Sequence, residues 1–347
     1  MNASRVADDT GISFANHLRV LDGWRGLSIL LVLVTHLMPI GPRANASIGV
    51  LGMVLFFTLS GFLITSSLLK STARTSEFLL RRFFRIVPLA WLYLAIVFTF
   101  QSETLRSMIA HFLFYANLPP PQIRLATDHL WSLCVEAQFY IGVALLFMLF
   151  KQRGLLILPL LGLAFTTLRI VGDVPVSSIT WFRIDEVLAG STLALVHHGR
   201  LGAVGAVIRR ELETLPQWPL FALLALSSLY DLDHVGWIAY LRPYLSALLV
   251  GATMANPRTS LGALLGRKSL LYLATISYAL YVIHLGLVHT WLGSGDLIEK
   301  YAKRPLLLAV LFVTAHVSTF YYEHPFIAYG RRLAKRWADA RPQGSPA

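Results

Sequence analysis

Charged residues are scarce in this chain of 347 residues. Asp, Glu, Lys and Arg make up 14% of it, whereas hydrophobic residues make up 56%. Soluble domains carry about a quarter charged residues. This scarcity excludes an ordinary soluble globular protein and predicts a protein that resides in a membrane.

Cysteine and the common cofactor motifs are also lacking. Cys134 is the single cysteine, so the chain forms no internal disulfide. The sequence has no Walker motif, dinucleotide-binding glycine fingerprint, CxxC pair or HExxH, and its histidines lack the spacing of metal ligands. We therefore expect no metal.

Acidic residues are few as well, with 18 Asp and Glu against 30 Lys and Arg and a net charge of +12. In a soluble protein this excess would suggest nucleic acid. Beside long apolar runs the basic residues indicate membrane topology instead, and we expect no nucleic-acid partner.

Eleven apolar runs are candidates for transmembrane helices, because a span needs about 20 mostly apolar residues. The run at 105–118 is the weakest, since it is short, contains Arg106 and His111, and ends in three prolines. The runs are 22–40, 48–69, 86–101, 105–118, 130–150, 154–171, 181–198, 216–230, 237–254, 269–292 and 305–325.

The distribution of basic residues selects one topology. With the N-terminus in the cytoplasm and 105–118 not crossing, 21 of the 30 basic residues face the cytoplasm. If 105–118 crossed, Arg209 and Arg210 would fall on the wrong side. We therefore predict an all-α bundle of about ten transmembrane helices with both termini cytoplasmic. The 105–118 segment is then re-entrant or interfacial on the outer side.

Two polar residues share one face of the first span. Arg25 and His36 are eleven positions apart, which is three helical turns plus about 20°. The rise between them is about 16 Å, so Arg25 lies at the cytoplasmic rim and His36 deep in the membrane. A neutral imidazole can accept a proton from a hydroxyl. The alternative is a histidine that only packs between helices.

Other polar residues interrupt later runs. Arg82 and Arg85 are three apart on one helix face, an arrangement that suits a phosphate, although inner-loop arginines also serve topology alone. Glu136 lies two turns inside its run, where a carboxylate needs a partner or a task. His284 lies in mid-span, and Glu323 ends the last span near the inner face.

Together these motifs resemble the membrane-bound acyltransferase 3 family, the OafA/YrhL-like bacterial integral membrane acyltransferases. Six blocks in the family's order carry the resemblance over nearly the whole chain. They are Leu21-Asp22-Gly23-Trp24-Arg25-Gly26 running to His36, the run from Phe56 to Leu63, Arg82-x-x-Arg85, the run from Trp131 to Tyr140, Ile276-Ser277-Tyr278 running to His284, and Glu323-His324-Pro325. Two departures are Ala137, where members often have a second acid, and Cys134, where they often have Ser.

The resemblance implies an enzyme that transfers an acyl group, commonly acetyl, from cytoplasmic acetyl-CoA to a hydroxyl of a carbohydrate. The acceptor would be extracytoplasmic or lipid-linked, as in modification of lipopolysaccharide or exopolysaccharide. It further implies the bacterial inner membrane and one acyltransferase domain over 1–347, with a core at about 17–330 and a basic cytoplasmic tail at 331–347.

The resemblance also assigns roles to residues. His36 and Glu136 would be catalytic, and Arg25, Arg82 and Arg85 would bind the donor. His36 would act as a general base or carry the acyl group transiently, and both routes stay open. The acceptor, entering from outside, would meet Glu136. The supporting residues would be Asp22, Ser60, Trp131, Ser132, Gln138, Tyr140, His284 and Glu323.

A different class of function remains open from the residues alone. A proton-coupled exporter of a polar or acylated metabolite would use His36, His284 and Glu136 as a proton relay. The hydropathy shows no clear inverted repeat, which weakens this alternative. A non-catalytic membrane subunit would leave the deep His36 unexplained. The acceptor, the acyl chain length and the oligomeric state are left undetermined.

Overall fold

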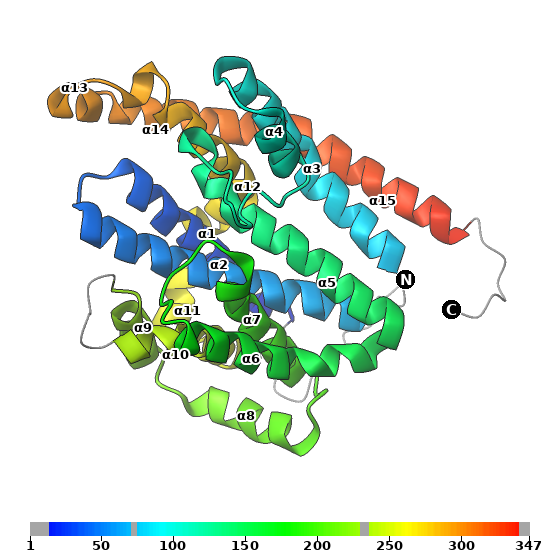
Figure 1. Cartoon of the computed structure of the whole chain (residues 1–347). Helices are drawn as coiled ribbons and strands as arrows, with labels where there is room; N and C mark the ends of the chain where they lie inside the picture. Colours follow the sequence, from blue (N-terminus) through cyan, green and yellow to red (C-terminus); the bar gives the residue numbers. More distant parts are fainter. Residues whose placement is uncertain (1–13, 71–74, 230–235, 340–347) are drawn as a thin grey trace, which may run out of the picture.

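A computed structural model describes residues 14–70, 75–229 and 236–339 of the chain, and every regular element in these ranges is helical (Figure 1). The long helices are α1 (Phe14–Leu37), α2 (Pro42–Lys70), α3 (Thr75–Phe100), α5 (Trp131–Gly154), α10 (Gly236–Ala255) and α12 (Lys268–Val288). Shorter ones are α4 (Leu105–Phe112), α6 (Leu158–Val171), α7 (Ile184–His197), α8 (Gly202–Thr214), α9 (Gln217–Ser227), α11 (Ser260–Leu265), α13 (Leu297–Ala302), α14 (Arg304–Val317) and α15 (His324–Asp339). Single turns or short pieces are η1 (Leu125–Leu130), η2 (Leu155–Ile157), η3 (Thr180–Phe182), η4 (Trp291–Gly293) and the π-helical η5 (Ser318–Glu323).

Helix α1 occupies the interior of the bundle. It packs against α2 on one side and α12 on the other, and α2 packs in turn against α7. Trp24, near the middle of α1, is fully buried, and its indole N–H donates to Thr253 Oγ1 of α10 at 2.8 Å. The polar residues of α1 are therefore shielded from lipid by protein on both sides.

Seven helical segments in the described ranges are long and apolar enough to cross a membrane. They are Arg19–Leu37, Pro42–Lys70, Thr75–Phe100, Leu125–Val171, Gly236–Ala255, Lys268–Val288 and Arg304–Trp337. The all-helical membrane fold is thereby confirmed.

The predicted number of about ten spans is not settled by these segments. Each predicted run contains a helix, but α6 follows α5 within one long segment, and α7 and α9 have only 14 and 11 residues. The 105–118 run forms the eight-residue α4 followed by turns. At about 12 Å, α4 is too short to cross a hydrocarbon core of about 30 Å, as predicted.

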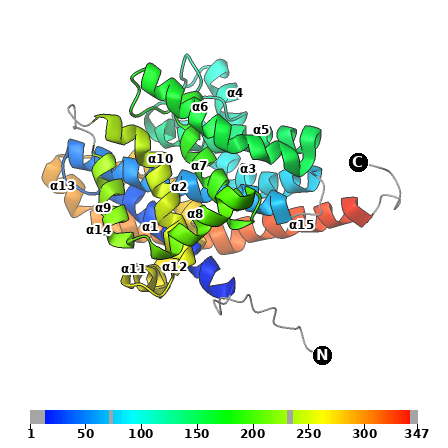
Figure 2. The ribbon, with the colours of Figure 1, turned by 90° about the horizontal axis from the view of Figure 1, so that it is seen from below.

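The proposed basic tail begins inside a helix. Residues 331–339 continue α15, which lies beside α3 in both ribbon views (Figures 1 and 2). Residues 340–347 lie outside the described part of the chain.

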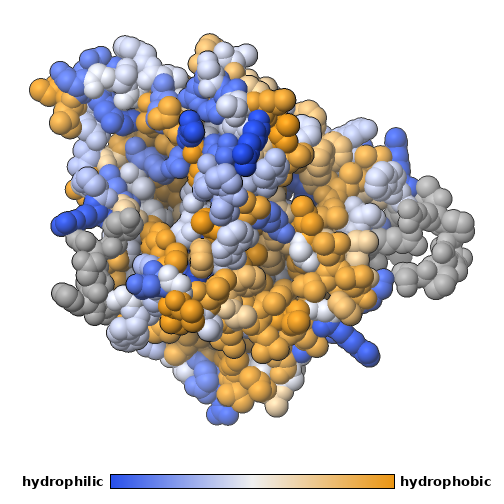
Figure 3. Space-filling view, in the orientation of Figure 1, coloured by the Kyte–Doolittle hydropathy of each residue, from blue (hydrophilic) through white to orange (hydrophobic). Residues whose placement is uncertain are grey.

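Large hydrophobic side chains face outward over α5 and α6. Figure 3 shows hydrophobic residues gathered on this part of the surface. They include Ile141, Leu145, Met148, Leu149 and Phe150 of α5, and Leu160, Leu163, Leu168 and Ile170 of α6. An exposed apolar surface of this kind is satisfied by lipid chains rather than by water.

Two glycines allow α2 and α7 to touch through their backbones. A Cβ added at Gly61 would lie 1.8 Å from the Val187 carbonyl oxygen, and one at Gly190 would lie 1.9 Å from that of Thr58. Small residues at crossing points permit close approach of membrane helices. This contact holds Ser60, the neighbour of Gly61, in a fixed position.

We expect Gly61→Ala to destabilise the protein by about 1–3 kcal/mol, because the new methyl group would push α2 away from α7. The midpoint of thermal unfolding in detergent measures this. Gly142→Ala is the matched control, since no atom lies within 4 Å of a Cβ built at this exposed position on α5. Equal midpoints for the two variants would contradict the backbone contact.

Candidate active site

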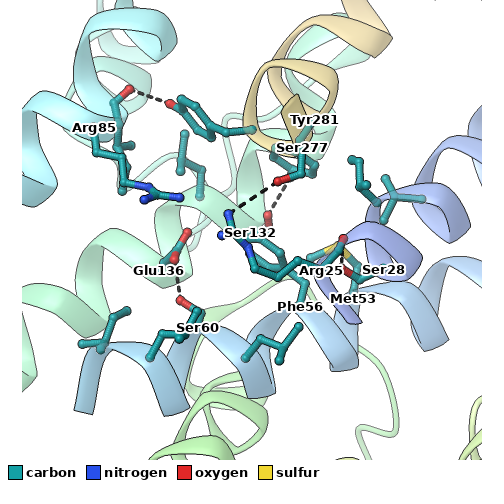
Figure 4. A pocket seen from close by; sticks show the side chains of 18 of the residues that line it. Arg25, Ser28, Met53, Phe56, Ser60, Arg85, Ser132, Glu136, Ser277 and Tyr281 are labelled. Atoms are coloured by element: carbon teal, nitrogen blue, oxygen red, sulfur yellow. Dashed lines mark hydrogen bonds between the residues drawn. The ribbon is translucent and has the colours of Figure 1, made fainter. Parts of the chain in front are cut away.

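A cavity of about 300 Å³ lies among α1, α2, α3, α5 and α12 and contains most of the charged residues predicted to act. We call it the arginine cavity. Figure 4 shows Arg25, Arg85 and Glu136 pointing into the same space. Its polar lining consists of Asp22, Arg25, Ser28, Ser60, Arg82, Arg85, Ser132, Glu136, Tyr140, Ser277, Tyr278 and Tyr281.

The arginines reach this cavity from two helices. Arg25 of α1 donates to Ser277 Oγ of α12 at 3.5 Å and lies 3.9 Å from an Asp22 carboxylate oxygen. Arg82 of α3 lies over the rings of Phe78 and Tyr140, at 5.6 Å from each centroid. The predicted convergence of Arg25, Arg82 and Arg85 is therefore present.

Helix α3 is tied to its neighbours next to these arginines. The Tyr278 hydroxyl of α12 donates to the Ile86 carbonyl at 2.5 Å, and the Tyr322 hydroxyl of η5 donates to the Pro88 carbonyl at 3.3 Å. These bonds fix the position of the segment that carries Arg82 and Arg85.

Glu136 lines the arginine cavity together with Arg25, Arg82 and Arg85. Its Oε1 accepts hydrogen bonds from the hydroxyls of Ser60 and Tyr140. Along α5, Glu136 is five residues, or about 7.5 Å, beyond Trp131, which begins the helix and lines the other cavity described below. The carboxylate thus faces the arginines rather than His36.

His36 lines a second cavity of about 170 Å³, which we call the histidine cavity. It lies toward the C-terminal end of α1. The His36 ring is tilted by 43° against that of His284 of α12, with 5.1 Å between centroids, and the His284 ring lies 4.9 Å from that of His129 of η1. Besides His36 and His129, the lining residues are Val32, Thr35, Gly49, Val50, Met53, Asp128, Trp131, Val176, Ser177, Arg183 and Tyr281.

The hydrogen bonds of two histidines determine their neutral forms. His284 Nδ1 lies 2.6 Å from the Tyr281 carbonyl oxygen, and His129 Nε2 lies 3.1 Å from that of Val282. A carbonyl oxygen only accepts, so each of these nitrogens carries the proton when the ring is neutral. His284 Nε2 and His129 Nδ1 are then acceptors, both buried and without a hydrogen-bond partner in the described structure.

One face of α1 connects the two cavities. Asp22, Arg25 and Ile29 line the first, His36 lines the second, and Val32 lines both. Met53 of α2 and Tyr281 of α12 also line both cavities. These three residues form a shared wall of the two cavities, which therefore lie next to each other along the face of α1 that carries Arg25 and His36.

The remaining predicted residues have more local contacts. Trp131 lines the histidine cavity, with its ring 5.7 Å from that of Phe57. The Ser132 hydroxyl forms a hydrogen bond of 2.6 Å with the Tyr281 hydroxyl. Gln138 bonds to Asn117 at 3.0 Å outside both cavities. Glu323 accepts hydrogen bonds from Ser318 and Thr319 of its own π-helical turn, and lines neither cavity.

The sequence did not single out His129, Tyr281 or Arg183 as site residues. Arg183 is buried between the rings of Phe57 and Trp131, with Nε 3.2 Å from a Glu186 carboxylate oxygen. Two sequence positions could have indicated these residues. His129 follows Asp128, and Tyr281 precedes His284 by three residues. Among the described residues no group of three His, Cys, Asp or Glu side chains is placed to hold a metal ion.

The helical bundle and these two cavities define a multi-pass membrane protein with its polar site buried between the helices. A family model described as an acyltransferase domain matches residues 18–323. The chain belongs to this acyltransferase 3 family.

Curated relatives agree with the family. The chain is 25% identical over 356 residues to the peptidoglycan O-acetyltransferase OatA of Listeria monocytogenes, covering 88% of this chain and 55% of that protein. It is 27% identical to the O-acetyltransferase OatA of Staphylococcus aureus, covering 89% of this chain and 57% of that one. The chain therefore spans a little over half the length of these relatives. No solved structure matches it.

The two cavities are expected to be accessible from opposite sides of the membrane. In a Cys134→Ala background, Ser177→Cys should react with an impermeant maleimide in intact cells, because Ser177 lines the histidine cavity. Ser277→Cys, in the arginine cavity, should react only in inverted vesicles.

Cys134 itself is buried, so the unsubstituted protein serves as the control for background labelling. Labelling of both introduced cysteines from the same side would disprove the two-sided arrangement.

Proposed function

We propose that this protein is a membrane O-acetyltransferase that moves an acetyl group from cytoplasmic acetyl-CoA to a hydroxyl of a cell-envelope carbohydrate. It would lie in the bacterial inner membrane with both termini in the cytoplasm. The name of the Listeria relative, a peptidoglycan O-acetyltransferase, supports a glycan as the acceptor.

One observation carries the proposal. A cavity lined by three arginines and a cavity lined by His36 and His129 border each other at Val32, Met53 and Tyr281. An anionic donor and a neutral hydroxyl acceptor need such different environments, and the reacting groups must still come within about 3–3.5 Å of each other. The shared wall is the place where both requirements are met.

The donor enters the arginine cavity in this proposal. Guanidinium groups donate paired hydrogen bonds to phosphate oxygens, so Arg82 and Arg85 hold the diphosphate of CoA. The pantetheine arm then extends along the face of α1 past Ile29 toward Val32. Glu136, held by Ser60 and Tyr140, balances part of the arginine charge while the cavity is empty.

The reaction takes place beside His36. The acceptor hydroxyl oxygen attacks the thioester carbonyl carbon while a His36 ring nitrogen accepts the hydroxyl proton. The carbon–sulfur bond breaks, the acetyl ester forms, and the CoA sulfur takes the proton from the imidazolium. His36 is neutral again at the end of the cycle.

His284 positions His36 for this step. The free Nε2 of His284 can only accept, and His36 is the neighbouring ring whose protonated nitrogen is not committed to a carbonyl. An N–H of His36 directed at His284 leaves the other nitrogen of His36 with its lone pair toward the histidine cavity. A base oriented by a third group is the arrangement found in catalytic triads.

We expect His36→Ala to abolish acetylation of envelope glycan, a loss of 10²-fold or more, because the general base is removed. Base-labile acetate on the isolated glycan of cells that contain or lack the gene measures it, with the amount of folded membrane protein as control. Normal acetylation by a well-expressed variant would remove His36 from the reaction.

We expect His284→Leu to lower kcat about 100-fold with little change in KM for acetyl-CoA, since only the orientation of the base is lost. His284→Gln, whose amide oxygen can replace the acceptor nitrogen, should recover part of kcat. Thiol release from acetyl-CoA with envelope glycan as acceptor gives both constants.

His111→Leu is the matched control for this experiment. His111 is also buried, bonds through Nδ1 to the Ser107 carbonyl at 2.8 Å and has an unpartnered Nε2, but the ring beside it is Phe98 rather than His36. Similar losses in the His111 and His284 variants would show that the effect is structural.

A further inference from the structure

A third cavity, of about 180 Å³, adjoins the arginine cavity between α3 and α15. We call it the α3–α15 pocket. It is lined by Arg81, Arg82 and Arg85 of α3 and by Arg331 of α15, together with Ser67, Phe78 and Ile327. Four guanidinium groups and no carboxylate line it, so the pocket is suited to a group with more than one negative charge.

Packing between the two helices brings Arg331 to this pocket. A Cβ added at Gly330 would lie 2.7 Å from Phe84 Cβ, so the missing side chain lets α15 approach α3. The Tyr329 ring packs on Phe84 at 5.3 Å between centroids. Arg331 follows directly in the chain, and its place opposite Arg81 and Arg82 is therefore set by the helix contact.

The charge on the pocket is only partly balanced. Glu77 lies 3.6 Å from Arg81 and is the one ion-pair partner found for the four arginines in the described structure. Placing like charges around one cavity costs free energy that an anionic ligand recovers. The arginine cavity already offers Asp22 and Glu136 to its own arginines, so the excess of positive charge is greatest in the α3–α15 pocket.

Arg82 and Arg85 line both cavities, so the two spaces meet at these residues. A ligand held at these two residues by a diphosphate extends one end into the arginine cavity and the other into the α3–α15 pocket. In CoA the first end is the pantetheine arm and the second is the ribose with its 3′-phosphate. That phosphate monoester carries between one and two charges near pH 7.

We infer that Arg331, with Arg81, forms a subsite for the 3′-phosphate of the donor nucleotide. This inference rests on the proposed function, because it takes acetyl-CoA as the donor. It adds a residue from the C-terminal helix to donor recognition and predicts that the protein distinguishes CoA from 3′-dephospho-CoA.

Binding of CoA and of 3′-dephospho-CoA to the purified full chain in nanodiscs tests the subsite. The wild-type protein should bind CoA about tenfold more tightly, the worth of one charge-assisted hydrogen bond. Arg331→Gln should weaken CoA binding by a similar factor and leave 3′-dephospho-CoA within twofold. Arg82→Gln should weaken both ligands, since it removes a contact to the diphosphate.

Arg332→Gln is the matched control, because this neighbouring arginine is exposed and lines none of the three cavities. It should leave both affinities unchanged. Equal weakening of the two ligands by Arg331→Gln, or no weakening of either, would overturn the subsite. Failure of the wild-type protein to bind CoA at all would instead overturn the proposed donor.

A phospholipid headgroup offers the same phosphate chemistry. The measurement is therefore repeated in nanodiscs of phosphatidylcholine alone and with added phosphatidylglycerol. The subsite predicts the same preference for CoA in both. A preference that disappears when phosphatidylglycerol is present, together with loss of co-purified phosphatidylglycerol from Arg331→Gln, would assign the pocket to lipid and overturn the inference.

Discussion

The structure depends on keeping the polar face of α1 away from lipid. A charged side chain in the middle of a membrane costs about 2.5–3.5 kcal/mol on insertion scales, and α1 carries both Arg25 and His36. The bundle meets this cost by packing α2 and α12 against α1 on two sides. The same packing leaves the space between the helices that becomes the two cavities, so the site follows from the way the polar helix is covered.

Hydropathy and helical periodicity predicted the parts of this arrangement that lie on one helix. The apolar runs located the helices, and the eleven-residue spacing placed Arg25 and His36 on one face of α1. The surroundings of Glu136 could not be predicted in the same way, because they depend on how α5 packs against α2 and α3. The meeting of His129 with His284 joins residues 155 positions apart and depends on packing between η1 and α12. Periodicity carries no information about such contacts.

Short helices limited the prediction of the membrane topology. The runs that contain α7 and α9 are apolar enough to resemble spans, but the helices have 14 and 11 residues. Buried polar groups explain part of this: Arg169 and Asp185, 2.5 Å apart, and Arg242, bonded to the Ser227 carbonyl, lie near the ends of these helices. Such groups must be satisfied inside the protein, which favours turns and short helices where an apolar sequence alone suggests a continuous span.

The wall of Val32, Met53 and Tyr281 also has an electrical consequence. Where cavities enter a membrane protein from both ends, the membrane potential falls mainly across the barrier that remains between them. A unit charge that crosses such a barrier does work of up to about 2.3 kcal/mol for each 100 mV. In the proposed reaction an uncharged acetyl group crosses without this cost, whereas the phosphates of its carrier would stay on the side where the arginines lie. The shared wall would thus allow the proposed chemical transfer across a membrane without a net transfer of charge.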